Sequence, residues 1–218
     1  EKAFAEYTGA KYAVAVSNGT AALHLSTMVL NLKPGDRVIT TPITFVASAN
    51  CVRYCGGDVV FADIDPETFL LDIRKVKELL GGAPPNSFQG IISVDFAGYP
   101  VNLEAYRKLA DEYGLWIIED ACHSPGGYFQ DSKGEKQRCG KGRFADLSVF
   151  SFHPVKHIAD PRGPGHFPVL EVPGPPGRSP ASDRHLNQGI PIMKIAAFLP
   201  ELFRPLFRKP ATVDYPFQ

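Results

Sequence analysis

The chain has 218 residues, enough for one sizeable hydrophobic core and an appendage. Its 23 acidic and 23 basic side chains balance, so no net charge favours nucleic acid or an anionic membrane. The four cysteines lack the CxxC spacing of a zinc site and are too few for a disulfide scaffold. We therefore expect a reduced, cytoplasmic protein that acts on small molecules and binds neither metal nor nucleic acid.

No stretch approaches the roughly 20 apolar residues that cross a bilayer, and the charged opening EKAFAEYTGAKY is not a signal peptide. The chain starts as if inside a helix, so we expect residues upstream to be missing. Six runs rich in β-branched residues predict strands: 12–17, 37–41, 58–64, 90–96, 115–120 and 145–152. Four stretches with apolar residues at three- and four-residue intervals predict helices: 20–32, 45–55, 72–80 and 102–113. This alternation predicts an α/β domain over 1–159, with a mostly parallel sheet, right-handed crossovers and helices on both faces.

The remaining residues follow a different pattern. Twelve of the 20 prolines lie after residue 159, and proline cannot donate to a regular hydrogen-bond ladder. We expect 160–190 to be irregular. Residues 191–218 regain apolar spacing with basic residues between, which predicts an amphipathic tail broken at its prolines. Docking of this tail on the protein body or on a partner is favoured over a membrane surface.

The first candidate site is SNGTAAL, which follows an apolar strand and opens a helix. Gly19 allows close approach of the backbone to an anion, and Thr20 adds a hydroxyl donor. The unpaired amides of the first helical turn would point at the ligand. The alternative is a turn glycine followed by an N-capping serine or threonine, which needs no ligand.

The second candidate is LWIIEDACHS, where Glu119 and Asp120 end a hydrophobic strand at the edge where open α/β sheets bind ligands. One of the two should face the site. Such a carboxylate could ligate a metal, act as a base, or hold the pyridine nitrogen of pyridoxal phosphate (PLP) protonated. Asp120 could also be a helix cap. His123 is near enough to reach the same ligand, although a lone histidine is more often structural.

The third candidate is SVFSFHPVKHI, in which a strand ends near Ser151 and a short proline-containing connection leads to Lys156. A lysine amine can form a Schiff base with PLP and then act as the base that moves a proton. Taken alone, this segment is better explained as an exposed loop lysine. Together, the three segments supply a phosphate cradle, a ring-nitrogen carboxylate and a Schiff-base lysine along one sheet.

Five phrases carry a family resemblance: TGAKYAVAVSNGTAALHL, TPITFVASAN, FADIDPETFLLD, IIEDACHSPGG and FADLSVFSFHPVKHI. The chain resembles DegT-type sugar aminotransferases, which are fold-type I PLP enzymes, over 1–159 but not over 160–218. HPVKHI is particularly similar to transaminases that make UDP-4-amino-4,6-dideoxy sugars. The resemblance implies a truncated fold-type I large domain that lacks the small C-terminal domain.

The resemblance also implies a cofactor site and assigns its residues by position. Lys156 and Asp120 would be catalytic, with Lys156 carrying the Schiff base and Asp120 pairing with the pyridine nitrogen. Some relatives have histidine in place of this lysine and are dehydratases, an outcome that Lys156 argues against. The set of cofactor-binding residues is Gly19, Thr20, Phe45, Asp120, His123, Ser151 and Lys156.

Within that set, Gly19, Thr20 and Ser151 would contact the phosphate. Phe45 would stack on the ring, and His123 would lie near its phenolic oxygen. The implied reaction moves an amino group from an amino acid, usually glutamate, to the C4 or C3 ketone of a nucleotide-linked deoxy sugar, for polysaccharide biosynthesis. The implied assembly is a homodimer.

Two other interpretations remain open. The chain could be a truncated, non-catalytic relative that binds PLP, a sugar nucleotide or a protein partner. A dinucleotide-binding α/β domain is disfavoured, because SNGT is not a GxGxxG fingerprint.

Overall fold

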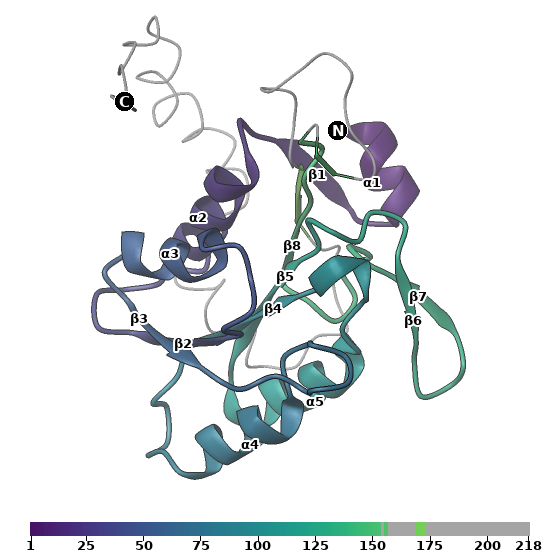
Figure 1. Cartoon of the computed structure of the whole chain (residues 1–218). Coiled ribbons are helices and arrows are strands. Elements are labelled where there is room, and N and C mark those ends of the chain that lie inside the picture. The colour runs from purple at the N-terminus through teal and green to yellow at the C-terminus, as the bar shows by residue number, and fades with distance from the viewer. Residues whose placement is uncertain (154, 157–168, 173–218) are drawn as a thin grey trace, which may run out of the picture.

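A computed structural model describes residues 1–153, 155–156 and 169–172. Its main sheet has seven strands in the order β1-β9-β8-β5-β4-β2-β3 (Figure 1). The strands of this sheet are β1 (Tyr12–Ala15), β2 (Arg37–Thr40), β3 (Asp58–Phe61), β4 (Gly90–Val94), β5 (Trp116–Asp120), β8 (Leu147–Val149) and β9 (Val169–Val172). A separate antiparallel hairpin consists of β6 (Tyr128–Gln130) and β7 (Lys136–Arg138).

The strands β3, β2, β4, β5 and β8 pair in parallel, which confirms the predicted mostly parallel sheet. Their register aligns Val94 of β4, Asp120 of β5 and Val149 of β8 at one edge. Ligands of open α/β sheets bind outside the carboxyl ends of the strands. The fold therefore places the end of β5 in the middle of the edge where a ligand is expected.

The prediction that 160–190 is irregular is wrong at Val169–Val172. These residues form β9, which pairs antiparallel with β1 and β8. The prediction weighed the proline content of the whole segment, but the sequence VLEV lies between Pro168 and Pro173 and keeps all four of its own amide donors. The rest of that segment and the expected amphipathic tail over 191–218 lie outside the described residues.

Helices cover both faces of the sheet, as predicted (Figure 1). They are α1 (Lys2–Thr8), α2 (Gly19–Val29), α3 (Ala47–Tyr54), α4 (Ile73–Gly81) and α5 (Leu103–Tyr113), with a 3-10 turn η1 (Phe96–Gly98). Ile118 of β5 belongs to a core cluster with α2 and α3, whereas Ile117 belongs to a cluster with α4 and α5. Successive strand side chains point to opposite faces, so one strand supplies both cores. Among the described residues, no helix has the length and apolarity needed to cross a bilayer.

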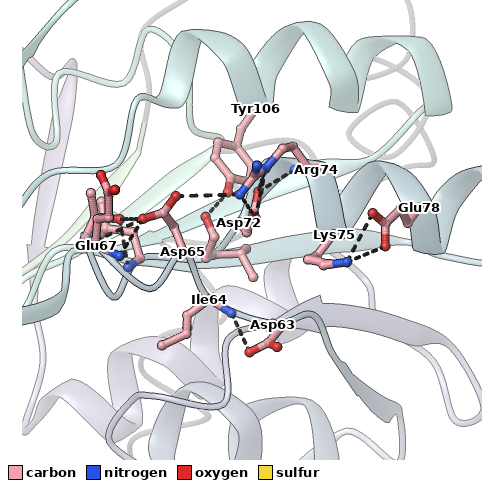
Figure 2. Close-up of polar contacts among 12 residues, drawn as sticks. Asp63, Ile64, Asp65, Glu67, Asp72, Arg74, Lys75, Glu78 and Tyr106 are labelled. Atoms are coloured by element: carbon pink, nitrogen blue, oxygen red, sulfur yellow. Dashed lines mark hydrogen bonds and ion pairs between the residues drawn. The ribbon is translucent and has the colours of Figure 1, made fainter.

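The segment between β3 and α4 is held by its own polar side chains (Figure 2). Asp72 caps α4 by accepting a hydrogen bond from the Arg74 amide at 2.8 Å, and the Arg74 guanidinium donates to the same carboxylate at 2.7 Å. These hydrogen bonds lower the pKa of Asp72. The Tyr106 hydroxyl of α5 donates to the Leu71 carbonyl, which ties the segment to the neighbouring helix. The phrase FADIDPETFLLD therefore has a structural role on the α4 and α5 face.

Candidate active site

The two carboxylates that end β5 point to opposite faces of the sheet. Asp120 is 5% exposed and accepts a hydrogen bond at Oδ2 from the Ser48 hydroxyl of α3 at 2.6 Å. Glu119 instead accepts hydrogen bonds from the Ser148 hydroxyl and the Gly140 amide. The alternation of strand side chains explains this difference. The strand pattern left open which carboxylate faces the site, whereas the family resemblance assigned Asp120. The structure directs Asp120 toward α2 and α3.

Asp120 is fixed by hydrogen bonds to both of its carboxylate oxygens. Its Oδ1 accepts from the Cys122 amide at 3.3 Å, in addition to the bond from Ser48 to Oδ2. The Ser48 hydroxyl lies 2.8 Å from the Thr44 hydroxyl, and the Ser48 amide donates to the Phe45 carbonyl at 3.1 Å. An ionised carboxylate has about four lone-pair sites. Asp120 is therefore oriented and retains capacity for a further donor from a ligand.

The N-terminus of α2 lies beside the segment that follows Asp120. Asn18 caps this helix by accepting from the Ala21 amide at 2.8 Å, so the interpretation with an N-capping serine or threonine is wrong. The first amides of a helix have no intrahelical acceptor and carry the positive end of the dipole. A Cβ added at Gly19 would lie 3.5 Å from Cys122 Sγ. A helix N-terminus, which is the kind of backbone site that can bind an anion, is thus adjacent to the end of β5.

Lys156 lies close enough to this segment for its charge to act there. Burial raises the pKa of the Cys122 thiol most, the Asp120 carboxylate raises it further, and the positive charge of Lys156 opposes this rise. Asp120 and Lys156 therefore both act on the same thiol. Lys156 is partly buried, and its amide donates to the His153 carbonyl at 2.8 Å, which closes the turn that carries it.

The other predicted site residues differ in their exposure and contacts. Ser151 is 9% exposed, and its hydroxyl oxygen accepts from the His153 amide at 3.4 Å. Phe45 is 68% exposed on the loop that leads into α3. Thr20 is partly buried in the first turn of α2, and His123 is partly buried with its ring centroid 6.3 Å from that of Phe96. The structure thus gathers Gly19, Asp120 and Lys156 around one cysteine and links Phe45 to them through Ser48, whereas the ligand contacts of Thr20, Ser151 and His123 stay predictions.

The sequence analysis missed three residues of this site. Ser48 follows Phe45 by one helical turn, but nothing in the sequence pairs it with a carboxylate 72 positions later. Cys122 stands inside the motif IIEDACHS and was treated only as a cysteine without zinc spacing. Asn18 precedes the turn glycine, and asparagine is among the strongest N-cap residues, so its role could have been inferred.

Comparison with known proteins identifies the family. The model of the DegT/DnrJ/EryC1/StrS aminotransferase family matches residues 1–163. The chain belongs to this family. GDP-perosamine synthase of Caulobacter vibrioides is 37% identical over 163 residues, which are 75% of this chain and 41% of that protein. The uncharacterized protein MJ1066 of Methanocaldococcus jannaschii is 36% identical over 75% of this chain and 39% of its own length.

Solved structures of this family share the fold. The structure of NtdA from Bacillus subtilis with bound cofactor PMP has a TM-score of 0.67 and 28% identity, over 86% of this chain and 38% of that one. DesV of S. venezuelae, in complex with a ketimine intermediate, has a TM-score of 0.68 and 28% identity, over 85% of this chain and 45% of that one. The expected fold class, an α/β PLP-transferase large domain, is confirmed. The chain spans about two fifths of the length of these relatives.

Proposed function

We propose that this chain is the PLP-binding large domain, over 1–159, of an aminotransferase that passes an amino group from an amino acid to a keto sugar. The observation that carries the proposal is the convergence on the Cys122 thiol. Asp120 accepts a hydrogen bond from the Cys122 amide, Gly19 at the start of α2 lies beside the Cys122 thiol, and the positive charge of Lys156 acts on that thiol. An acid, a base and an anion site are what PLP chemistry requires of a protein.

The N-terminus of α2 would bind the phosphate of the cofactor. The amides of Gly19 and Thr20 and the helix dipole favour a dianion there, and the missing side chain of Gly19 permits close approach. The Thr20 and Ser151 hydroxyls supply further donors. Asn18 already satisfies the Ala21 amide, so it keeps this turn in shape without occupying the first two amides.

Asp120 would hold a proton on the ring nitrogen of the cofactor. Bound PLP supplies an electron sink for a carbanion next to the amino group, and a charged ring nitrogen strengthens that sink. The Ser48 hydroxyl and the Cys122 amide orient the carboxylate before any ligand arrives. Phe45 is exposed on the loop that leads into α3 and would stack on the ring, and His123 would lie near its phenolic oxygen.

Lys156 would attach to the cofactor and then serve as the proton shuttle. Its amine would be the base of both half-reactions and would hold the proton that leaves the amino-acid carbon. The short turn closed by the His153 carbonyl limits where the amine can reach.

The proposed acceptor is the C4 or C3 ketone of a nucleotide-linked deoxy sugar, and the proposed donor is glutamate. The family match and the similarity to a GDP-perosamine synthase support a nucleotide sugar. The phrase HPVKHI supports a 4-amino-4,6-dideoxy product. A cytoplasmic homodimer, a role in polysaccharide biosynthesis, and completion of the site by a small C-terminal domain and a partner subunit are parts of the same proposal.

The experiment is covalent trapping at the lysine. The 218-residue protein is mixed with PLP, its absorbance is recorded, and borohydride reduction is followed by peptide mass mapping. We expect a coloured protein with the adduct on Lys156, and loss of both in Lys156→Ala. Lys33→Ala is the matched control, because Lys33 is exposed and its amine contacts Asn31.

Two outcomes would count against the proposal. An adduct on another lysine, or none, would remove Lys156 from its role. Colour that is retained without transfer of the amino group from glutamate would favour the interpretation of a non-catalytic binding protein.

A further inference from the structure

On the face of the sheet opposite Asp120, two carboxylates and a thiol are buried together. Asp95 is 0% exposed, Glu119 1% and Cys139 3%. One carboxylate oxygen of each acid and the cysteine Sγ all lie within 4.8 Å of one another. This cluster stands on the carboxyl ends of β4 and β5 and on the residue after β7.

The hydrogen-bond donors to the two acids are neutral. The Val101 amide donates to Asp95 Oδ1 at 2.9 Å, and the Ser124 hydroxyl donates to Asp95 Oδ2 at 2.5 Å. For Glu119, the Gly140 amide at 2.9 Å and the Ser148 hydroxyl at 2.6 Å both donate to Oε2. Among the residues that the structure describes, no lysine or arginine forms an ion pair with either acid.

Two ionised carboxylates at this separation are not stable in a desolvated site without a cation. Each charge loses its hydration, and the two repel each other at low dielectric. Paired buried carboxyls resolve this conflict by sharing one proton. The geometry also indicates which acid holds it, because a proton on Glu119 Oε1 leaves both hydrogen bonds to Oε2 intact, whereas each oxygen of Asp95 already accepts one.

We propose that Asp95 and Glu119 form a buried pair that holds one proton on Glu119 Oε1 and fixes the loops around the end of β5. Ser124 belongs to the turn that follows Asp120, Gly140 follows the β6–β7 hairpin, and Val101 precedes α5. The pair therefore positions the turn that carries Cys122 and His123 without touching a ligand. This inference does not depend on the proposed function.

The surrounding charges agree with this arrangement. Burial raises the pKa of Glu119 most, and the charge of Asp95 raises it further. Burial also raises the pKa of Asp95, with a smaller rise from Asp120. The Cys139 thiol also faces the pair and is a hydrogen-bond partner of both acids. Burial and the two acids raise the pKa of this thiol, and the charge of Asp95 also acts on the Cys122 thiol. The folded pair thus binds its proton more tightly than the unfolded chain does.

The sign of the pH dependence follows from that tighter binding. The stabilisation is fully present below the ordinary carboxyl pKa of about 4 and is lost as pH rises through the raised value. Glutamine has the shape of a protonated glutamate and cannot ionise. The thermal midpoint of Glu119→Gln relative to wild type should therefore increase between about pH 5 and about pH 9, by about 5 °C.

Glu112→Gln on the exposed surface of α5 is the matched control, and its difference from wild type should stay constant over the same range. A constant difference for Glu119→Gln would overturn the proposal. A second measurement does not require the variant to fold: infrared spectra of the wild-type protein at neutral pH should contain the C=O band of a protonated carboxyl. The absence of that band would overturn the proposal, as would a thermal midpoint that falls on treatment with EDTA, because a bound cation would then neutralise the pair.

Discussion

Glu119 and Asp120 are neighbours on β5 and almost equally buried, yet their surroundings on the two faces of the sheet differ. On the α4 and α5 face, Glu119 belongs to a set of groups whose hydrogen bonds all end within the protein. On the α2 and α3 face, Asp120 lies beside a helix N-terminus, a partly buried lysine and an exposed phenylalanine. Burial alone therefore does not mark a ligand site. The distinguishing feature is what lies beside each carboxylate: a helix N-terminus and a lysine charge near Asp120, and a second acid with a thiol near Glu119.

The largest effects should come from the two cores beneath these faces. Ile117 and Ile118 are both fully buried, in the α4/α5 and α2/α3 clusters respectively. Truncation of either to alanine leaves a cavity and should lower the free energy of unfolding by about 2–5 kcal/mol, as measured by urea denaturation. Only Ile118→Ala, which loosens α2 and α3, should also weaken PLP binding at a temperature where both variants are folded. Equal weakening in Ile117→Ala would contradict the separation of the two faces.

Much of this fold was predictable because the strand and helix periods are strong in the first 159 residues. Strand β9 could not be predicted, because its partner β1 lies more than 150 positions earlier and a strand of four residues carries little periodicity. The hairpin of β6 and β7 was missed for a related reason. Its strands have three residues each, and KQR has no apolar alternation to distinguish it from a loop.

A pair of serines provides the second test. The Ser48 hydroxyl donates to Asp120 and the Ser148 hydroxyl donates to Glu119, both at 2.6 Å. A hydrogen bond to a charged group contributes about 1.5–3 kcal/mol, and one to a neutral group about 0.5–1.5 kcal/mol. Ser48→Ala should therefore slow the glutamate half-reaction by roughly tenfold to a hundredfold, because the ring-nitrogen carboxylate is no longer held in place.

Ser148→Ala should lower the free energy of unfolding by about 1 kcal/mol and leave that half-reaction unchanged. Stopped-flow absorbance and urea denaturation measure the two effects. If Ser148→Ala slowed the reaction as much as Ser48→Ala, the two faces would not be functionally distinct.

The site was predictable as residue types at strand and helix ends, but its connections were not. Gly19, Asp120 and Lys156 could be singled out because Asp120 ends a strand and the other two follow strands closely. Their roles toward a cofactor stay predictions. Ser48 could not be assigned, because its partner is fixed by the crossing of α3 over β5 rather than by local sequence. The Asp95 and Glu119 pair escaped notice for the same reason, since two adjacent strands bring them together.

Two helix caps give the smallest and most selective comparison. Asn18 caps α2 on the α2 and α3 face of the sheet, and Asp72 caps α4 on the α4 and α5 face. Each side chain accepts a hydrogen bond of 2.8 Å from a backbone amide. Replacement of an N-cap by alanine costs about 1 kcal/mol. Asn18→Ala and Asp72→Ala should therefore destabilise the protein by similar amounts in urea denaturation, with a slightly larger loss for Asp72 because Arg74 also pairs with it.

Their effects on the cofactor should differ. Loss of Asn18 frays the turn whose first amides would bind the phosphate, so the dissociation constant of PLP, measured by absorbance titration, should rise severalfold. Asp72→Ala should leave it unchanged, because α4 lies on the other side of the sheet from Asp120. If both caps changed the dissociation constant equally, the phosphate site could not be assigned to the N-terminus of α2, and binding would instead follow global stability.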